Sequence, residues 1–369
     1  MARRRGGDRV VNPGAVVIVV YFLLQLLIYG VGVLHLDGSV VEATKTRMAI
    51  GLFANAGVAL YVLHTVQTVR QRSIVLGMLS IGLTFECVVG LLQSFTGIDL
   101  RFLFQPPGFV LNLEETGFTE RNGAFRVVGT SHHAIEFAVL AAVAVPLTLH
   151  LARYATKPLY RQCAAVGCLI AVFAMPAGGS RAGVVALAAA LLTYMFAFTL
   201  RQIANGILVG IGAGLVYVVA APASAYALWL TVVKANEDGS VLSRLADYST
   251  VARTFHDHPW FGLGLGGNPP TVYGFLDNEW LQSIVQGGIV GFAAMLVVVG
   301  GTVAGLTAGL RTARSSRERD QAYAIGAALV GIIASSFTFD LFTYQQATFV
   351  YFVLFGLMWS SWRRDAGRR

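Results

Sequence analysis

The sequence is short of charge. Only 12% of its 369 residues are Asp, Glu, Lys or Arg, whereas 56% are hydrophobic, and the mean hydropathy is +0.65. Soluble domains carry about 25% charged residues, so a soluble fold is excluded. The apolar residues gather in runs of about 18 to 25, the length that a helix needs to cross a hydrocarbon core of about 30 Å. The sequence therefore predicts an all-α, polytopic membrane protein.

Cysteine is scarce as well. The three cysteines, Cys87, Cys163 and Cys168, all lie within predicted spans, which indicates small buried hydrophobic residues and excludes a disulfide framework. Their spacing matches no metal-binding motif. The predicted cytoplasmic loops are too short for an ATPase or a soluble catalytic domain. We therefore expect no metal and no other cofactor.

The apolar runs predict about ten transmembrane helices within a single transmembrane domain, residues 1–369. An even number of spans places both termini on the same side of the membrane. The predicted spans are 12–34, 48–67, 74–92, 134–152, 162–178, 182–200, 203–230, 280–307, 321–338 and 341–361.

Basic residues are distributed unequally between the two sides of these spans. Of the 27 lysines and arginines, 18 fall on the side of the termini: Arg3, Arg4, Arg5, Arg9, Arg70, Arg72, Arg153, Lys157, Arg161, Arg201, Arg311, Arg314, Arg317, Arg319, Arg363, Arg364, Arg368 and Arg369. Because cytoplasmic loops are enriched in Lys and Arg, both termini are predicted to be cytoplasmic. The net charge of +8 follows from this topology and does not indicate nucleic-acid binding.

Two segments on the opposite, extracytoplasmic side are much longer than a tight turn. They cover residues 94–133 and 231–279, and both carry aromatic residues that can pack on helix ends. The second is also predicted to hold a short amphipathic helix. Long loops are uncommon unless they are functional or disordered, so these two segments are the expected place for a site.

Polar residues gather where the first of these loops meets a span. Arg126 precedes His132, His133 and Glu136 at the entry to the fourth predicted span. Glu136 follows the histidines by one helical turn, so the three side chains are expected to form a polar cluster. Ionisable residues at the rim of a span are costly and usually functional or paired. Metal ligation by this trio is the less favoured alternative.

Arg181 lies in a glycine-flanked hairpin, residues 178–183, between two apolar runs. One interpretation is an interfacial arginine that snorkels to the headgroups. We favour a site role, because glycines permit close backbone approach to an anion and a guanidinium binds phosphate bidentately.

The second long loop carries further candidates. Arg244 and Arg253 lie on its amphipathic segment, and His258 follows. The glycines of residues 262–267 formally match a dinucleotide-binding fingerprint, but no strand precedes them, so a flexible turn that re-enters the membrane is the better interpretation.

Asp277, Asn278 and Glu279 stand at the head of the eighth predicted span. Asp277 suits two compatible roles, since Asp and Asn both cap helices and a carboxylate at the membrane edge suits a general base. Glu279 would point about 200° away from Asp277 if both were helical.

Taken together, these residues resemble the O-antigen ligase and polymerase family of bacterial membrane glycosyltransferases. The resemblance covers about residues 126–295. It rests on four elements in order, namely 126–133, 180–183, Arg244 followed by 257–264, and 277–278 leading into 287–291.

The resemblance implies a metal-independent transferase in the bacterial cytoplasmic membrane. Its donor would be a glycan linked to undecaprenyl diphosphate, and its acceptor a glycan outside the membrane. Arginines matching Arg181 and Arg244 would hold the donor diphosphate. The chemistry agrees with these roles. A diphosphate leaving group needs stabilisation of its negative charge, which guanidiniums supply. The acceptor hydroxyl must lose its proton, and for this one base is enough. In-line attack would invert the anomeric centre.

One departure from the family pattern bears on the reaction. Ligases typically carry His-Asn where this chain has Asp277-Asn278. This favours a polysaccharide polymerase over an O-antigen ligase that acts on a lipid or protein acceptor. A peptidoglycan polymerase and a lipid-linked glycan transporter or flippase remain as alternatives; the latter predicts broken helices with charge near the membrane midplane.

Overall fold

The computed structural model describes residues 11–34, 38–109, 118–121, 123–233, 239–274 and 276–362, without the side chains of 121, 232 and 239–246. The predicted all-α class is confirmed: strands in these residues are limited to the hairpin of β1 (Thr119–Arg121) and β2 (Ala124–Arg126). The α-helices are α1 (Pro13–Val33), α2 (Ser39–Thr65), α3 (Val69–Thr96), α4 (Ala134–Tyr154), α5 (Pro158–Ala174), α6 (Arg181–Tyr194), α7 (Leu200–Ala220), α8 (Pro222–Val233), α9 (Gly239–Asp257), α10 (Pro270–Tyr273), α11 (Glu279–Thr312), α12 (Ser316–Ser335) and α13 (Gln345–Trp359). Short 3-10 turns add η1 (Arg101–Phe104), η2 (Met175–Gly178), η3 (Met195–Ala197) and η5 (Leu341–Thr343).

Seven helices in the described part of the chain are long and apolar enough to cross a membrane: α1, α2, α3, α4, α5 with η2, α7 and α11. The other three predicted spans are also occupied by helices, α6, α12 and α13. Helices α6 and α13 are shorter than those seven, and α12 begins with a turn of charged residues. Helices therefore stand at all ten predicted positions. The two long loops begin a few residues later than predicted, because α3 continues to Thr96 and α8 to Val233.

Two predicted spans are not continuous helices. The prediction of one span over 203–230 was wrong, because α7 ends before Pro222, where Ala221 leaves the helical region (φ −138°, ψ 62°). Proline lacks a backbone N–H and disfavours a helical residue before it. The span predicted at 280–307 begins at Glu279 and is broken at Gly288 (φ 57°, ψ −141°).

The break in α11 is filled by the glycine-rich segment that precedes the helix. Beyond Gly288, the backbone N–H of Ile289 donates to the carbonyl of Pro259 (2.9 Å). Gly264, in the same segment, has a positive φ of 88°, and a Cβ there would lie 2.4 Å from Gly32 Cα of α1. These glycines thus allow backbone to pack directly on backbone, and the turn is tightly held.

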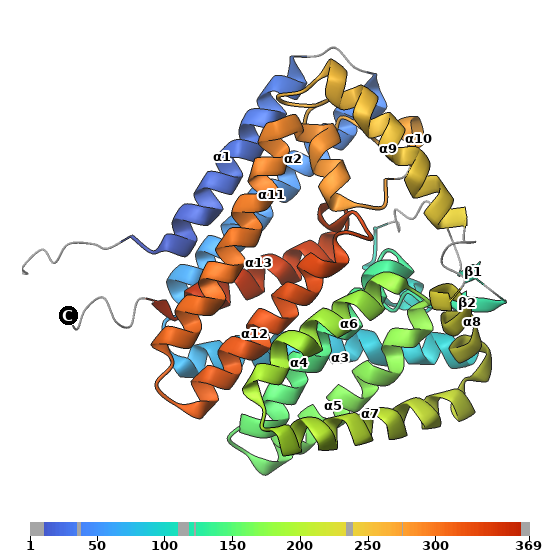
Figure 1. Ribbon diagram of the computed structural model, residues 1–369, viewed down its shortest axis with the longest axis vertical. Helices are drawn as coiled ribbons and strands as arrows, with labels where there is room; N and C mark the ends of the chain where they lie inside the picture. Colours follow the sequence, from blue (N-terminus) through green and yellow to red (C-terminus); the bar gives the residue numbers. More distant parts are fainter. Residues whose placement is uncertain are drawn as a thin grey trace, which may run out of the picture.

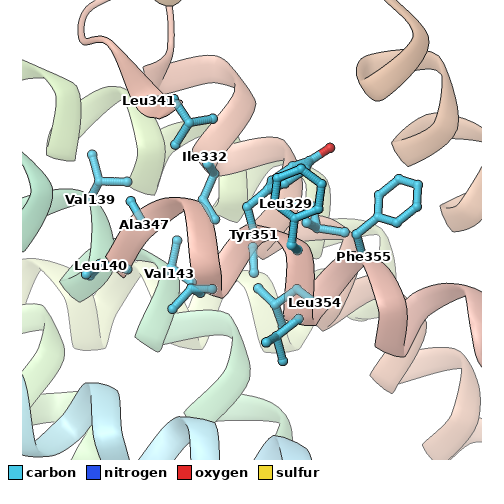
Figure 2. Packing of buried hydrophobic residues seen from close by; sticks show 14 of the residues in the cluster. Val139, Leu140, Val143, Leu329, Ile332, Leu341, Ala347, Tyr351, Leu354 and Phe355 are labelled. Atoms are coloured by element: carbon cyan, nitrogen blue, oxygen red, sulfur yellow. The ribbon is translucent and has the colours of Figure 1, made fainter. Parts of the chain in front are cut away.

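Helix α4 forms the centre of the bundle. It packs against α3, α5, α6, α12 and α13, and its many alanines allow neighbouring helices to approach closely. Figure 2 shows this core, in which Val139 and Leu140 of α4 lie beside Ile332 of α12 and Ala347 of α13. In Figure 1, α1, α2 and α11 flank one side of the α12–α13 pair and α4 to α7 the other.

The two ends of the described chain lie together. The Asn12 side chain caps α1 and also donates to the Trp359 carbonyl at the end of α13 (3.0 Å). Helix α13 therefore begins at the opposite end of the bundle, where its first turn meets that of α4 and the preceding η5 meets the first turn of α11. We call this opposite end the site end, because most of the candidate residues lie there.

Candidate functional site

Glu136 joins two helices at the site end. Its Oε1 accepts the backbone N–H groups of Gln346 (2.9 Å) and Ala347 (3.0 Å), and its Oε2 accepts the N–H of His132 (3.1 Å). The N-cap residue of α13, Tyr344, makes no side-chain capping bond. Glu136 of α4 therefore caps α13, satisfying donors that a helix start leaves without an intrahelical partner. The link between Glu136 and the histidines is therefore the backbone N–H of His132, and the carboxylate is occupied by backbone groups.

His133 is the N-cap of α4. Its Nδ1 accepts the backbone N–H of Ile135 (3.1 Å), so this nitrogen is engaged. Burial, and then the positive charge of Arg126, lower the pKa of His133 to about 4, which keeps the ring neutral at pH 7. The ring lies 5.8 Å from that of Tyr344. His132 is exposed, and its carbonyl accepts a bond from Arg101 Nη1 (3.2 Å). The Nδ1 of His133 is therefore occupied by the backbone and is not available as a metal ligand.

Arg126 lies beside the turn that leads to Arg181. Its Nε donates to the Gly178 carbonyl (3.1 Å), and the next residue, Val127, donates its N–H to Ala177 (3.2 Å). Gly179 turns with a positive φ of 55°, and a Cβ there would lie 3.2 Å from Arg126 Cγ. The structure thus brings together two segments, 126–133 and 178–183, that lie about 50 residues apart.

Arg181 is the first residue of α6. The preceding Ser180 caps that helix by accepting the N–H of Ala182 (3.2 Å), and Arg181 Nη1 is buried. A Cβ on Gly183 would lie 2.7 Å from Ala138 Cβ of α4. This glycine therefore serves helix packing and fixes the start of α6, with its arginine, against α4.

At the head of α11, the cap is Asn278. Its Oδ1 accepts the N–H groups of Trp280 (2.9 Å) and Leu281 (3.3 Å). From the sequence, either Asp277 or Asn278 could cap this helix. In the structure the cap is Asn278. Asp277 is half-buried just before the cap. Glu279 is buried, and its Oε2 accepts the N–H of Phe342 in η5 (2.9 Å), which ties α11 to the α12–α13 connection.

Asp340 is a candidate that the sequence analysis missed. It lies between α12 and η5, only 7% exposed, and its Oδ1 has no hydrogen-bond partner among the described residues. Burial, and then the negative charge of Asp277, raise the pKa of Asp340 to about 7. The available signal was a single acid between two closely spaced apolar runs.

Tyr344 connects the acidic and basic parts of this cluster. Burial is the largest cause of its raised pKa, and the negative charges of Asp340, Asp277 and Glu136 add to it, while the positive charge of Arg126 opposes it. The charges of three carboxyl groups and one guanidinium therefore act on the Tyr344 hydroxyl. We call the residues Arg126, His133, Asp277, Asp340 and Tyr344 the outer cluster.

The candidates of the second long loop lie on or after α9. Arg253 is exposed, and its hydrogen bonds go to Ser249 and Thr250 of its own helix (both 3.4 Å). Arg244 belongs to α9, but its side chain lies outside the described residues. His258 is exposed just after α9, and its carbonyl accepts the N–H of Gly262 (3.1 Å).

The fold and this cluster define a multi-pass, α-helical membrane protein with charged groups gathered at one end of its bundle. Residues 166–296 match the family model described as O-antigen ligase. This match supports the assignment of the chain to the O-antigen ligase and polymerase family, and so to ligase- or polymerase-type membrane enzymes. A search of curated proteins finds no match. The matched segment includes Arg181, Arg244 and Asp277, whereas Arg126 and Asp340 lie outside it.

Proposed function

We propose that the protein is a polysaccharide polymerase that transfers a glycan from an undecaprenyl diphosphate-linked donor to an acceptor sugar hydroxyl. The site end would lie on the extracytoplasmic face of the bacterial cytoplasmic membrane, with both termini in the cytoplasm. The observation that carries the proposal is the outer cluster, in which the charges of Arg126, Asp277 and Asp340 all act on Tyr344.

The basic side of the cluster suits a diphosphate. Arg126 is fixed beside the turn that starts α6 with Arg181, and planar guanidiniums bind phosphate oxygens bidentately. Arg244 and Arg253 on α9 would complete the donor site. Charge that develops on the leaving diphosphate would be stabilised by these fixed groups, as in other sites that bind a developing anion.

The acidic side suits removal of a proton. In the proposed step the acceptor hydroxyl oxygen bonds to the anomeric carbon as the bond from that carbon to the diphosphate oxygen breaks. The hydroxyl proton passes to Asp277, the lipid diphosphate leaves as an anion, and the anomeric centre is inverted. The cap of α11 is Asn278, so Asp277 is not needed for capping. The raised pKa of Asp340 favours its protonated form, so this neighbour of Asp277 would add less negative charge to the site.

Polymerisation is preferred to ligation because Asp277 stands where ligases typically carry His. The remaining side chains of the region, His132, His258 and Glu279, would position the loops. No metal and no other cofactor enters the proposed step.

The test uses the purified full-length protein in detergent with a synthetic undecaprenyl diphosphate oligosaccharide and no nucleotide. We expect a ladder of lengthened lipid-linked glycans. A single product on an added lipid or protein acceptor would identify a ligase. In a parallel assay with proteoliposomes, glycan that stays unchanged but crosses the bilayer would identify a transporter. Either result overturns the polymerase.

A further inference from the structure

Helices α2 and α3 follow each other in the sequence but pack on different partners. Helix α2 packs on α1 and α13, whereas α3 packs on α4 and α5. Between them lies a cavity of about 1100 Å³ that is floored by α13 and α4. Its walls are mainly apolar, with Ile50 and Gly51 of α2 facing Met78 and Gly82 of α3.

This groove faces outward at the depth of the membrane. Ile50 is 65% exposed and Met78 is 67% exposed, and both belong to candidate spans. Side chains of this kind face the hydrocarbon of a bilayer, so a lipid chain can enter from the side. Because lipid tails are themselves apolar, entry brings no hydrophobic gain. The groove would instead select a chain by shape and orient whatever polar group that chain carries.

The polar end of the groove leads to the outer cluster. Glu86, Thr130 and Gln346 line it there. The Gln346 side chain donates to the Thr130 carbonyl (3.1 Å), while its backbone N–H donates to Glu136. Ser131, next to Thr130, donates to Glu86. Gln346 lies two residues from Tyr344, so a chain in the groove would deliver its polar end to the cluster.

We propose that this groove holds the apolar tail of the lipid-linked donor, a single linear polyprenyl chain. This inference rests on the proposed function for the donor's identity. A single chain with one polar end fits a groove whose lining is mainly apolar along the spans, apart from Asn55, and also includes the charged residues Glu42, Arg47 and Glu86. A phospholipid differs, because its two tails share a headgroup that belongs at the bilayer surface.

Two glycines allow the groove to be filled without disturbing the protein. Gly51 and Gly82 line it, and a Cβ built on either meets no atom within 4 Å. Gly57 of α2 and Gly77 of α3 are equally open but lie outside the lining. Replacement of glycine by leucine favours the helix at all four positions. The double variant G51L/G82L therefore tests the groove, and G57L/G77L is its matched control.

The first measurement is photo-crosslinking with a polyprenyl diphosphate that carries a diazirine on its tail, followed by mapping of the labelled peptides. We expect labelling within α2 and α3 of the full-length protein. It should fall at least tenfold in G51L/G82L, remain in G57L/G77L, and resist an excess of phosphatidylglycerol. Equal labelling of both double variants, or displacement by the phospholipid, would overturn the proposal and leave a site for bulk lipid.

The second measurement is glycan transfer from long-tailed and short-tailed donors. We expect G51L/G82L to lose at least tenfold in kcat/KM with the long tail and to match the control with the short tail. Equal loss with both donors would overturn the proposal. If the wild-type protein transfers no glycan but the labelling follows the expected pattern, the proposed function fails while the assignment of the groove to a polyprenyl chain stands.

Discussion

Asp277 and Asp340 form a pair of interacting carboxyl groups, in which the charge of Asp277 helps to raise the pKa of buried Asp340 to about 7. Asp277 precedes α11, and Asp340 lies between α12 and η5. Two like charges held close together in a buried place favour a shared proton. The pair therefore gives the site end a buried carboxyl group, Asp340, that holds its proton more tightly than a free Asp side chain.

This pair makes stability depend on pH. Because the pKa of Asp340 is raised from 3.8 to about 7 on folding, the native state binds the proton more tightly. Its stabilising contribution is complete below about pH 4 and is lost as the pH rises through 7. Asp340→Asn should abolish this loss and be more stable than wild type at pH 8, by at most roughly 4 kcal/mol. Thermal unfolding at pH 5 and pH 8 measures the difference. Asp257→Asn, at an exposed residue, is the control. An Asp340→Asn variant that is less stable than wild type at pH 8 would contradict the account.

Asp277→Asn tests the proposed base. The amide has the size of the carboxyl group but accepts no proton, so transfer should fall by about 10² to 10⁴-fold while the donor still binds. Folding should be preserved, because the cap of α11 is Asn278. Asp277→His should keep partial activity, since imidazole takes a proton at neutral pH. The measurements are glycan transfer from pH 5 to 9 and donor binding. Normal turnover in Asp277→Asn would move the search for a base to Glu279 and His258.

The helices were predictable because their signal is local. A run of apolar residues identifies a span wherever it packs, so all ten predicted positions hold helices. The breaks at Pro222 and Gly288 also have local signals, but averaging hydropathy over a long window conceals them.

The contacts that build the site were not predictable in this way. Glu136 was expected near the histidines, which are its neighbours in the chain, but its bonds to Gln346 and Ala347 span about 210 residues. Asp340 became a candidate only when the fold placed it beside Asp277. Chemistry-bearing residues at helix starts were identified from the sequence, whereas their partners depend on which helix ends meet in space.

Glu136 is expected to matter for stability. Glu136→Gln replaces one of its two accepting oxygens by an N–H₂ group, which removes the acceptor either of the His132 N–H or of the Gln346 and Ala347 N–H groups. The cost should be about 1 to 3 kcal/mol. Thermal unfolding in detergent measures it, with the exposed Glu120→Gln as the control. An unchanged unfolding temperature together with lost transfer would instead assign Glu136 to the chemistry.

The orientation can be tested by labelling single cysteines, after replacement of the three native ones, with a membrane-impermeant thiol reagent on intact cells. Cysteines placed at Asn112 and Asn236 should react, because the basic residues predict these loops to be outside. A cysteine at Ser316, at the start of α12, should react only after the cells are opened. Labelling of the Ser316 position alone would invert the topology.

Arg181 offers the sharpest test of the donor site. Lysine keeps the charge but loses the planar fork, so Arg181→Lys should raise the KM for the lipid diphosphate donor at least tenfold if two phosphate oxygens are bound at once. Arg181→Ala should be weaker still, because a charge-assisted contact is lost altogether. Arg161→Lys is the matched control, since Arg161 is exposed on the predicted cytoplasmic side and its Nε donates to the Ala152 carbonyl (3.1 Å). The measurements are donor KM and kcat, with thermal unfolding to verify that α6 still packs on α4. Wild-type KM in Arg181→Ala would show that this guanidinium serves the membrane interface, and Arg126 would then be the first arginine to replace.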